Sequence, residues 1–143
     1  MKKILFLVVM FLISLFSVNA QTVNAVSTAT NSVKSGDTFE VTINISKCDL
    51  SCFAQYQQQI PNGFTASEIS SMSDNANFYF ENGKVLYQWY KLPVNRNDIV
   101  LKYKISVDAN TVPGVYELPG YFSYQINNRL GQVDTKLSVE VKK

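Results

Sequence analysis

Histidine is missing from this 143-residue chain, and cysteine occurs only twice. Without histidine, the common serine and cysteine nucleophile arrangements lack their general base, and the commonest transition-metal ligand is absent. Two thiolates would fill only half of the tetrahedral shell of a zinc ion, so carboxylates would have to complete it. The six glycines are spread through turn sequences and form neither a P-loop nor a dinucleotide-binding motif. We therefore expect no metal, no cofactor and no enzymatic activity.

Paired carboxylates are the one catalytic arrangement that this composition leaves open, because glycoside hydrolysis needs only two acidic groups in a cleft, ~5–10 Å apart. The acidic residues worth considering lie in turns or at predicted strand ends, where solvation accounts for them: Glu68, Asp74, Glu81, Asp98 and Asp108.

Charge is scarce and almost balanced. The net charge of +2 results from 13 basic and 11 acidic residues, and Lys2 and Lys3 supply the whole excess. No basic cluster follows them, and binding to phosphate backbones depends on such clusters. We therefore expect no nucleic acid as a partner.

The only long apolar run stands at the start of the chain. Residues 4–16 are apolar apart from one serine, follow the two lysines, and precede a small-residue cleavage pattern that ends at Ala20. This run is too short for a helix that crosses ~30 Å of hydrocarbon, which needs ~20 residues. The sequence thus predicts a signal peptide over residues 1–20, with a permanent anchor as the alternative. Residues 21–143 are expected to form a single domain that is secreted, periplasmic or on the cell surface, with no membrane span after signal removal.

Cys48 and Cys52 stand in the sequence CDLSC. An oxidising compartment favours a disulfide between them, and a turn over the three intervening residues would bring their Cα atoms within the ~4.4–6.8 Å that a bridge needs. We therefore predict a Cys48–Cys52 disulfide that staples a bend. A redox pair is the alternative, although the spacing is not that of a C-x-x-C motif.

Most of the remaining chain alternates apolar and polar residues, which is the period of a β-strand. The clearest segments are TFEVTINIS (38–46), DIVLKYKISV (98–107) and VDTKLSVEV (133–141), and turn sequences separate the runs at regular intervals. No segment carries an apolar stripe at helical spacing. The sequence therefore predicts an all-β fold, namely a two-sheet antiparallel β-sandwich of jelly-roll or immunoglobulin-like type with about eight or nine strands.

The segment NFYFENGKVLYQWY (77–90) predicts a β-hairpin around Asn82-Gly83, a dipeptide typical of two-residue type I′ turns. In that register Phe78 faces Tyr87, and the face that they share with Trp89 points to the core. The solvent-side face then carries Tyr79, Glu81, Lys84, Leu86, Gln88 and Tyr90.

The segment FAQYQQQIPNGF (53–64) contains four glutamines. Alternation directs Gln55, Gln57 and Gln59 outward and Gln58 inward, where its amide requires a buried hydrogen-bond partner. Outward amides beside exposed tyrosines could bind a ligand, since an aromatic ring stacks on a sugar while amides bond its hydroxyls. The alternative is that these are simply the polar positions of a half-exposed strand.

The order of these segments resembles that of the cohesin and carbohydrate-binding-module type of β-sandwich found in secreted bacterial proteins. The similar elements are VKSGDTFEVTINI, FAQYQQQI followed by PNGF, DIVLKYKISVDAN, and VPGVYELPGYFSY. The resemblance implies a two-sheet, jelly-roll-like sandwich used for binding or assembly rather than for chemistry. The chain departs from that type because it has no calcium-ligand cluster and no flat set of exposed tryptophans.

Two functions follow as hypotheses. The first is an exported binding or envelope-assembly module that contacts a protein partner. The second is a carbohydrate-binding module that reads a glycan. The candidate ligand-binding residues are Gln55, Gln57, Gln59, Tyr79, Gln88, Tyr90 and Tyr121.

Overall fold

The computed structural model describes residues 22–69 and 74–143, so the predicted signal peptide, residues 1–20, lies outside the described part. The described residues form twelve strands and no helix, and none of them belongs to a helix that could cross a membrane. The strands are β1 (Asn24–Ala29), β2 (Ser32–Lys34), β3 (Thr38–Ser46), β4 (Ala54–Gln59), β5 (Phe64–Glu68), β6 (Asn77–Glu81), β7 (Lys84–Trp89), β8 (Asp98–Val107), β9 (Gly114–Glu117), β10 (Gly120–Ile126), β11 (Arg129–Thr135) and β12 (Ser138–Lys142).

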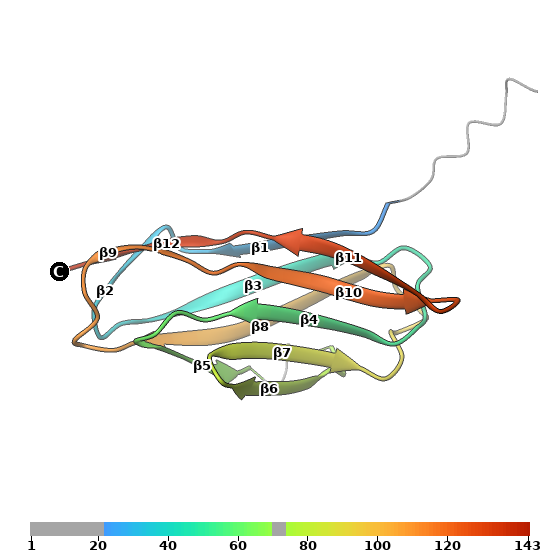
Figure 1. Cartoon of the computed structure of the whole chain (residues 1–143), viewed down its shortest axis with the longest axis horizontal. Coiled ribbons are helices and arrows are strands. Elements are labelled where there is room, and N and C mark those ends of the chain that lie inside the picture. The colour runs from blue at the N-terminus through green and yellow to red at the C-terminus, as the bar shows by residue number, and fades with distance from the viewer. Residues whose placement is uncertain (1–21, 70–73) are drawn as a thin grey trace, which may run out of the picture.

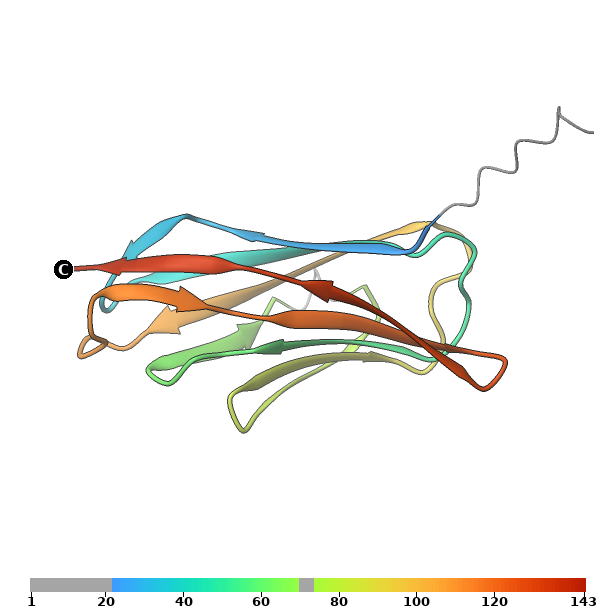
Figure 2. The same ribbon diagram turned by 45° about the horizontal axis from the view of Figure 1, so that its top comes forward.

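Two sheets form the layers of a sandwich (Figures 1 and 2). One sheet has the strand order β1-β3-β8-β5, and the other has the order β11-β10-β4-β7-β6. A third sheet, β2-β12-β9, lies at the end of the sandwich away from the β10–β11 hairpin (Figure 1). The pairing is antiparallel except between β12 and β2, which run parallel. The predicted all-β sandwich is confirmed, with this small sheet and its parallel pair in addition.

The core lies between the layers and is built by alternate residues. Along β3, Phe39, Val41, Ile43 and Ile45 are buried, and β8 buries every second residue from Ile99 to Val107 in the same way. Burial of alternate apolar side chains is the main force that holds such sheets together. The inside and outside assignment made from the alternation is therefore correct for these strands.

The structure has more strands than the sequence predicts, in part because two expected runs are divided. Pro119 separates β9 from β10, because proline has no N–H to donate to a neighbouring strand. The Pro119 carbonyl accepts a hydrogen bond from the backbone N–H of Gln59 at 2.8 Å. The run over residues 133–141 is divided between Thr135 and Ser138, where the chain leaves the five-stranded sheet and enters the small one.

The predicted hairpin is confirmed in register and turn type. Phe78 pairs with Tyr87, and Asn82 and Gly83 have φ values of 51° and 69°, as a type I′ turn requires. The Gly83 carbonyl accepts hydrogen bonds from the Ile60 amide at 2.8 Å and from Gln59 Nε2 at 3.0 Å, which join the hairpin tip to the end of β4. Trp89 is buried, as predicted.

A buried polar network crosses the core between the sheets. The Gln58 amide on β4 accepts a hydrogen bond from the Tyr103 hydroxyl on β8, and its Nε2 donates to the Leu118 carbonyl at 2.8 Å and to Ser27 Oγ at 3.3 Å. These contacts supply the buried partners that the inward position of Gln58 demands. Burial raises the pKa of Tyr103 well above its ordinary value, and the nearby Tyr56 adds to the effect.

The predicted disulfide is wrong, because Cys48 and Cys52 are both free thiols. The loop that contains them folds around the buried Lys47 ammonium, which donates to the Leu50 carbonyl at 2.8 Å and the Cys48 carbonyl at 3.4 Å. Cys48 has a left-handed φ of 54°, and the Cys52 carbonyl accepts a hydrogen bond from the Leu92 amide at 2.9 Å. The loop thus satisfies a buried cation and a neighbouring backbone amide instead of closing a five-residue ring.

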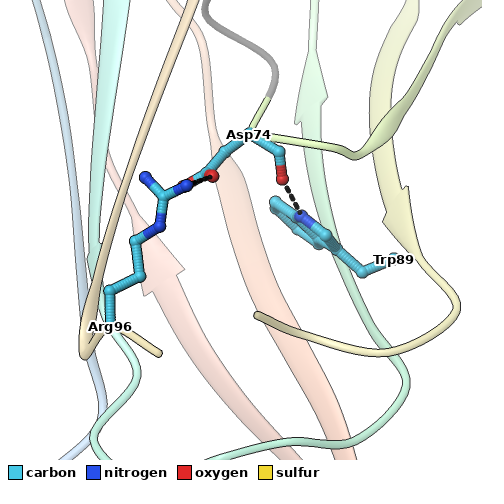
Figure 3. A network of polar contacts seen from close by, with 3 residues as sticks. All are labelled: Asp74, Trp89 and Arg96. Carbon is cyan, nitrogen blue, oxygen red and sulfur yellow. Dashed lines mark hydrogen bonds and ion pairs between the residues drawn. The ribbon is translucent and has the colours of Figure 1, made fainter. Parts of the chain in front are cut away.

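The connection that enters β6 is fixed by Asp74 (Figure 3). Its backbone carbonyl accepts a hydrogen bond from Trp89 Nε1 at 3.0 Å, and its carboxylate forms an ion pair with Arg96 at 2.8 Å. Asp74 and Asn75 have left-handed φ values of 49° and 59°, which these residue types tolerate better than most. The contacts join this connection to the loop between β7 and β8.

Candidate binding surface

The outer face of the five-stranded sheet carries most of the candidate residues. Cross-strand pairing aligns its outward positions into two rows that run across all five strands. The first row is Asp134, Tyr121, Gln57, Leu86 and Tyr79, and the second is Gln132, Ser123, Gln55, Gln88 and Asn77. We name these ten residues the amide–tyrosine face; the strands that carry them follow one another from β11 to β6 in Figure 1.

Hydrogen bonds hold parts of this face in place. The Tyr121 hydroxyl donates to Gln57 Oε1 at 3.2 Å, and Gln132 Nε2 donates to Asp134 Oδ1 at 2.8 Å. Gln55 and Gln88 pair across β4 and β7, and both side chains are partly exposed.

Two shallow hollows lie on this side of the sheet and share Gln57. One, of about 410 Å³, is lined by Gln57, Tyr79, Glu81, Asn82, Lys84, Leu86 and Gln88. The other, of about 440 Å³, is lined by Gln57, Gln59, Pro119, Gly120, Tyr121, Asp134, Thr135 and Lys136. Each hollow therefore combines one tyrosine with one lysine, one carboxylate and at least two side-chain amides.

The outer face of the four-stranded sheet has a different chemistry. Its cross-strand rows contain small hydroxyl residues and charged residues, such as Thr42 beside Lys102 and Glu40 beside Lys104. Its exposed large apolar residues are two valines, Val26 and Val100. Aromatic residues are enriched at binding surfaces, and only the amide–tyrosine face presents them among the described residues of the two large sheets.

The structure brings together most of the residues that the sequence singled out. Gln55, Gln57, Tyr79, Gln88 and Tyr121 belong to the amide–tyrosine face. Gln59 lies on the same side at the end of β4, where it lines the second hollow. Tyr90 follows β7 directly and is 92% exposed, so it lies beyond the end of the two rows.

Sequence reasoning missed the contribution of β11. Gln132 and Asp134 face outward beside Ser123 and Tyr121. The alternation of residues 129–135 could have placed them on an outward face. Asn127-Asn128, with φ values of 48° and 60°, forms a two-residue turn between β10 and β11 and was a local sign that these strands pair.

The described residues contain no group of three or more cysteine or acidic side chains that could hold a metal ion. Each of the two hollows contains a single carboxylate, Glu81 or Asp134. Glycoside hydrolysis by acid and base requires a pair.

Comparisons with protein-family models and with curated proteins found no match. Solved structures are similar in fold. A non-cellulosomal cohesin from the archaeon Archaeoglobus fulgidus superposes with a TM-score of 0.62 and 16% identity over 86% of this chain and 93% of that one. BslA, a bacterial hydrophobin, gives a TM-score of 0.43 at 12% identity, covering 86% of this chain and 97% of its own. A family 123 glycoside hydrolase from Clostridium perfringens gives 0.42 at 12% identity, covering 85% of this chain and 28% of its own. The similarity to the cohesin shows that the chain has a cohesin-like β-sandwich fold.

Proposed function

We propose that the protein is an exported, non-enzymatic binding module that contacts a protein partner through the amide–tyrosine face. The arrangement of this face carries the proposal. Its first row places Leu86, Gln57 and two tyrosines between the carboxylates of Glu81 and Asp134 on the two edge strands. An apolar and aromatic centre with a polar rim is the usual anatomy of a protein–protein interface.

The absence of a carboxylate pair in either hollow supports the non-enzymatic part of the proposal. The sequence of residues 1–20 supports export. Intact mass of the protein recovered outside the cytoplasm tests this second part, because cleavage after Ala20 leaves a chain that begins at Gln21. A chain retained at full length in the cytoplasm would contradict it.

Capture from an envelope extract tests the contact surface. The variant with Tyr79→Ala and Tyr121→Ala removes both aromatic rings of the first row, and tyrosine is frequent among the residues that dominate binding energy. We expect the wild-type chain to capture a defined protein. The affinity of this variant for that protein should be at least about tenfold weaker, which corresponds to ~1.4 kcal/mol.

The matched control carries Val26→Ser and Val100→Ser on the outer face of the other sheet, where both valines are exposed. It should retain the partner as the wild type does. Capture that both variants preserve, or that both lose equally, would place the contact elsewhere and contradict the proposal.

A glycan is the second candidate partner, and the two hollows favour it. Each offers an aromatic ring next to amides and a carboxylate, which is the chemistry that binds a pyranose ring and its hydroxyls. Titration with a panel of soluble polysaccharides should then shift the side-chain amide NMR signals of Gln57 and Gln59. Silence across the panel would remove this candidate and leave the protein partner in place.

A further inference from the structure

Exposed apolar side chains gather at one end of the sandwich. Of the large apolar residues that are exposed in the described ranges, five lie in the β10–β11 hairpin or in the connections beside it: Phe53, Tyr90, Val94, Ile126 and Leu130. We name these five residues the apolar end. Three of them are mostly exposed, with Tyr90 at 92%, Leu130 at 73% and Val94 at 65%. Apolar groups left in water in such a cluster mark an interaction site.

Backbone contacts show that three of these residues, Phe53, Tyr90 and Leu130, lie near one another. The Phe53 carbonyl accepts a hydrogen bond from the Gln125 amide at 3.2 Å, and Gln125 pairs with Leu130 across the hairpin. Tyr90 follows Trp89, which pairs with Ala54, so Tyr90 and Phe53 occupy adjacent positions at the end of their strands. Phe53, Tyr90 and Leu130 therefore extend the outward side of the five-stranded sheet beyond its amide rows.

The hairpin exposes apolar groups on both of its sides. Leu130 pairs with Gln125 on the outward side, whereas Ile126 continues the inward series of Phe122 and Tyr124. The hairpin projects past the other strands at this end (Figure 2), so Ile126 stays 38% exposed instead of reaching the core. A flat protein surface can contact only one side of such a tip, whereas the headgroup layer of a bilayer can surround both sides.

Two cations flank the apolar residues. Lys91 follows Tyr90, Arg129 precedes Leu130, and both are exposed. Two exposed carboxylates lie at the same end: Asp49, in the connection that also contains Phe53, and Asp98, which opens β8 in the opposite sheet and accepts a hydrogen bond from Ser46. Lys91 and Arg129 are the charged residues next in sequence to Tyr90 and Leu130. The apolar end therefore presents basic, aromatic and aliphatic side chains together, which complements an anionic lipid surface.

We propose that the apolar end docks peripherally on an anionic phospholipid bilayer. Leu130, Tyr90 and Phe53 enter the boundary between headgroups and acyl chains, and Lys91 and Arg129 pair with lipid phosphates. Tyrosine suits this depth because its ring is apolar and its hydroxyl remains in the polar layer. The amide–tyrosine face then stands beside the membrane and remains free for its own partner.

Vesicle flotation tests the proposal with the exported, processed protein. Vesicles of phosphatidylcholine with about 30% phosphatidylglycerol supply the negative surface, and pure phosphatidylcholine vesicles are the neutral comparison. We expect flotation with the anionic vesicles and much less with the neutral ones. The variant with Leu130→Ser and Tyr90→Ser should bind at least about tenfold more weakly, since it removes two side chains that bury apolar surface.

Exposed valines at the opposite end of the sandwich offer a matched control. Val112 and Val115 are 71% and 68% exposed, and Val115 belongs to β9, at the opposite end of the sandwich from the turn that joins β10 and β11 (Figure 1). A variant with Val112→Ser and Val115→Ser should float as the wild type does. Because all chains share the same N-terminal processing, any contribution from that segment cancels in the comparison.

Three results would overturn the proposal. The first is no flotation with anionic vesicles. The second is equal loss of flotation in the valine control and in the variant at Leu130 and Tyr90. The third is concentration-dependent dimerisation by sedimentation that this variant abolishes, without any vesicle binding, which would assign the apolar end to a second copy of the chain.

Discussion

Replacement of Gln58 by leucine should be among the most damaging conservative changes in this fold. Gln58 is fully buried, and its amide serves three groups: the Tyr103 hydroxyl, the Leu118 carbonyl and Ser27 Oγ. Leucine keeps most of the volume but leaves these groups without their partner. A buried polar group that loses its partner costs ~1–3 kcal/mol, and the hydroxyls can partly reorient, so we expect a loss of about 3 kcal/mol. This is a large part of the ~5–15 kcal/mol that is typical of folded domains.

Urea unfolding measures this loss, with circular dichroism and Trp89 fluorescence as two probes that must agree for a two-state analysis. A double-mutant cycle separates the network from simple packing. Tyr103→Phe alone leaves Gln58 Oε1 without its donor, whereas Tyr103→Phe combined with Gln58→Leu removes both partners at once. The double variant should therefore be at least about 1 kcal/mol more stable than the sum of the single effects predicts.

Tyr87→Phe is the control, because the Tyr87 hydroxyl donates a single hydrogen bond to the Lys102 carbonyl at 3.0 Å, outside the Gln58 network. It should cost about 1 kcal/mol and be additive with Gln58→Leu. If Gln58→Leu changes the free energy of unfolding by less than about 0.5 kcal/mol, or if its effect is additive with Tyr103→Phe, the assigned network is refuted.

Three further predictions concern other parts of the core and its rim. Gly120→Ala should destabilise by about 3 kcal/mol in urea unfolding, because a Cβ there would lie 2.7 Å from the Gln57 carbonyl oxygen and 2.8 Å from the Tyr56 hydroxyl; wild-type stability would contradict this packing. Burial raises the pKa of Tyr56 from 10.0 to about 12, so its contribution to stability is complete below pH 10 and is lost as the pH rises toward 12. The free energy of unfolding, measured by urea titration, should therefore decrease steadily from pH 10 to pH 12. The decrease should be less steep in the Tyr56→Phe variant. Arg96→Gln should lower the free energy of unfolding by about 1–2 kcal/mol, because the carboxylate of Asp74 is only 5% exposed and loses its cation. The 56% exposure of Arg96 keeps the effect below that of a fully buried pair. Thermal unfolding indistinguishable from that of the wild type would count against the ion pair.

The sequence predicted what depends on neighbouring residues. Alternation identified the buried side of β3 and β8, because a half-buried strand repeats every two residues. Asn82-Gly83 predicted the β6–β7 register, because a type I′ turn fixes which residues face each other. The outward direction of Gln55 and Gln57 followed from the same rule.

Long-range pairing could not be predicted in this way. The amide–tyrosine face exists because β4 lies between β10 and β7, so that Gln57 is flanked by Tyr121 and Leu86. No local pattern encodes this strand order. The disulfide prediction failed for a related reason, since the shape of the loop at Cys48 is determined by the enclosed Lys47 ammonium, and spacing alone gives no sign of it.

The position of β12 has a consequence for biosynthesis. This strand lies between β2 and β9 and contributes Val139 and Val141 to the core, so residues separated by about a hundred positions must meet before the sandwich can close. Until Lys142 has left the ribosome, the emerging polypeptide lacks a component of its own interior. For the export proposed above, such a delay would leave the chain unfolded while it crosses a translocation pore, and folding would complete on the far side.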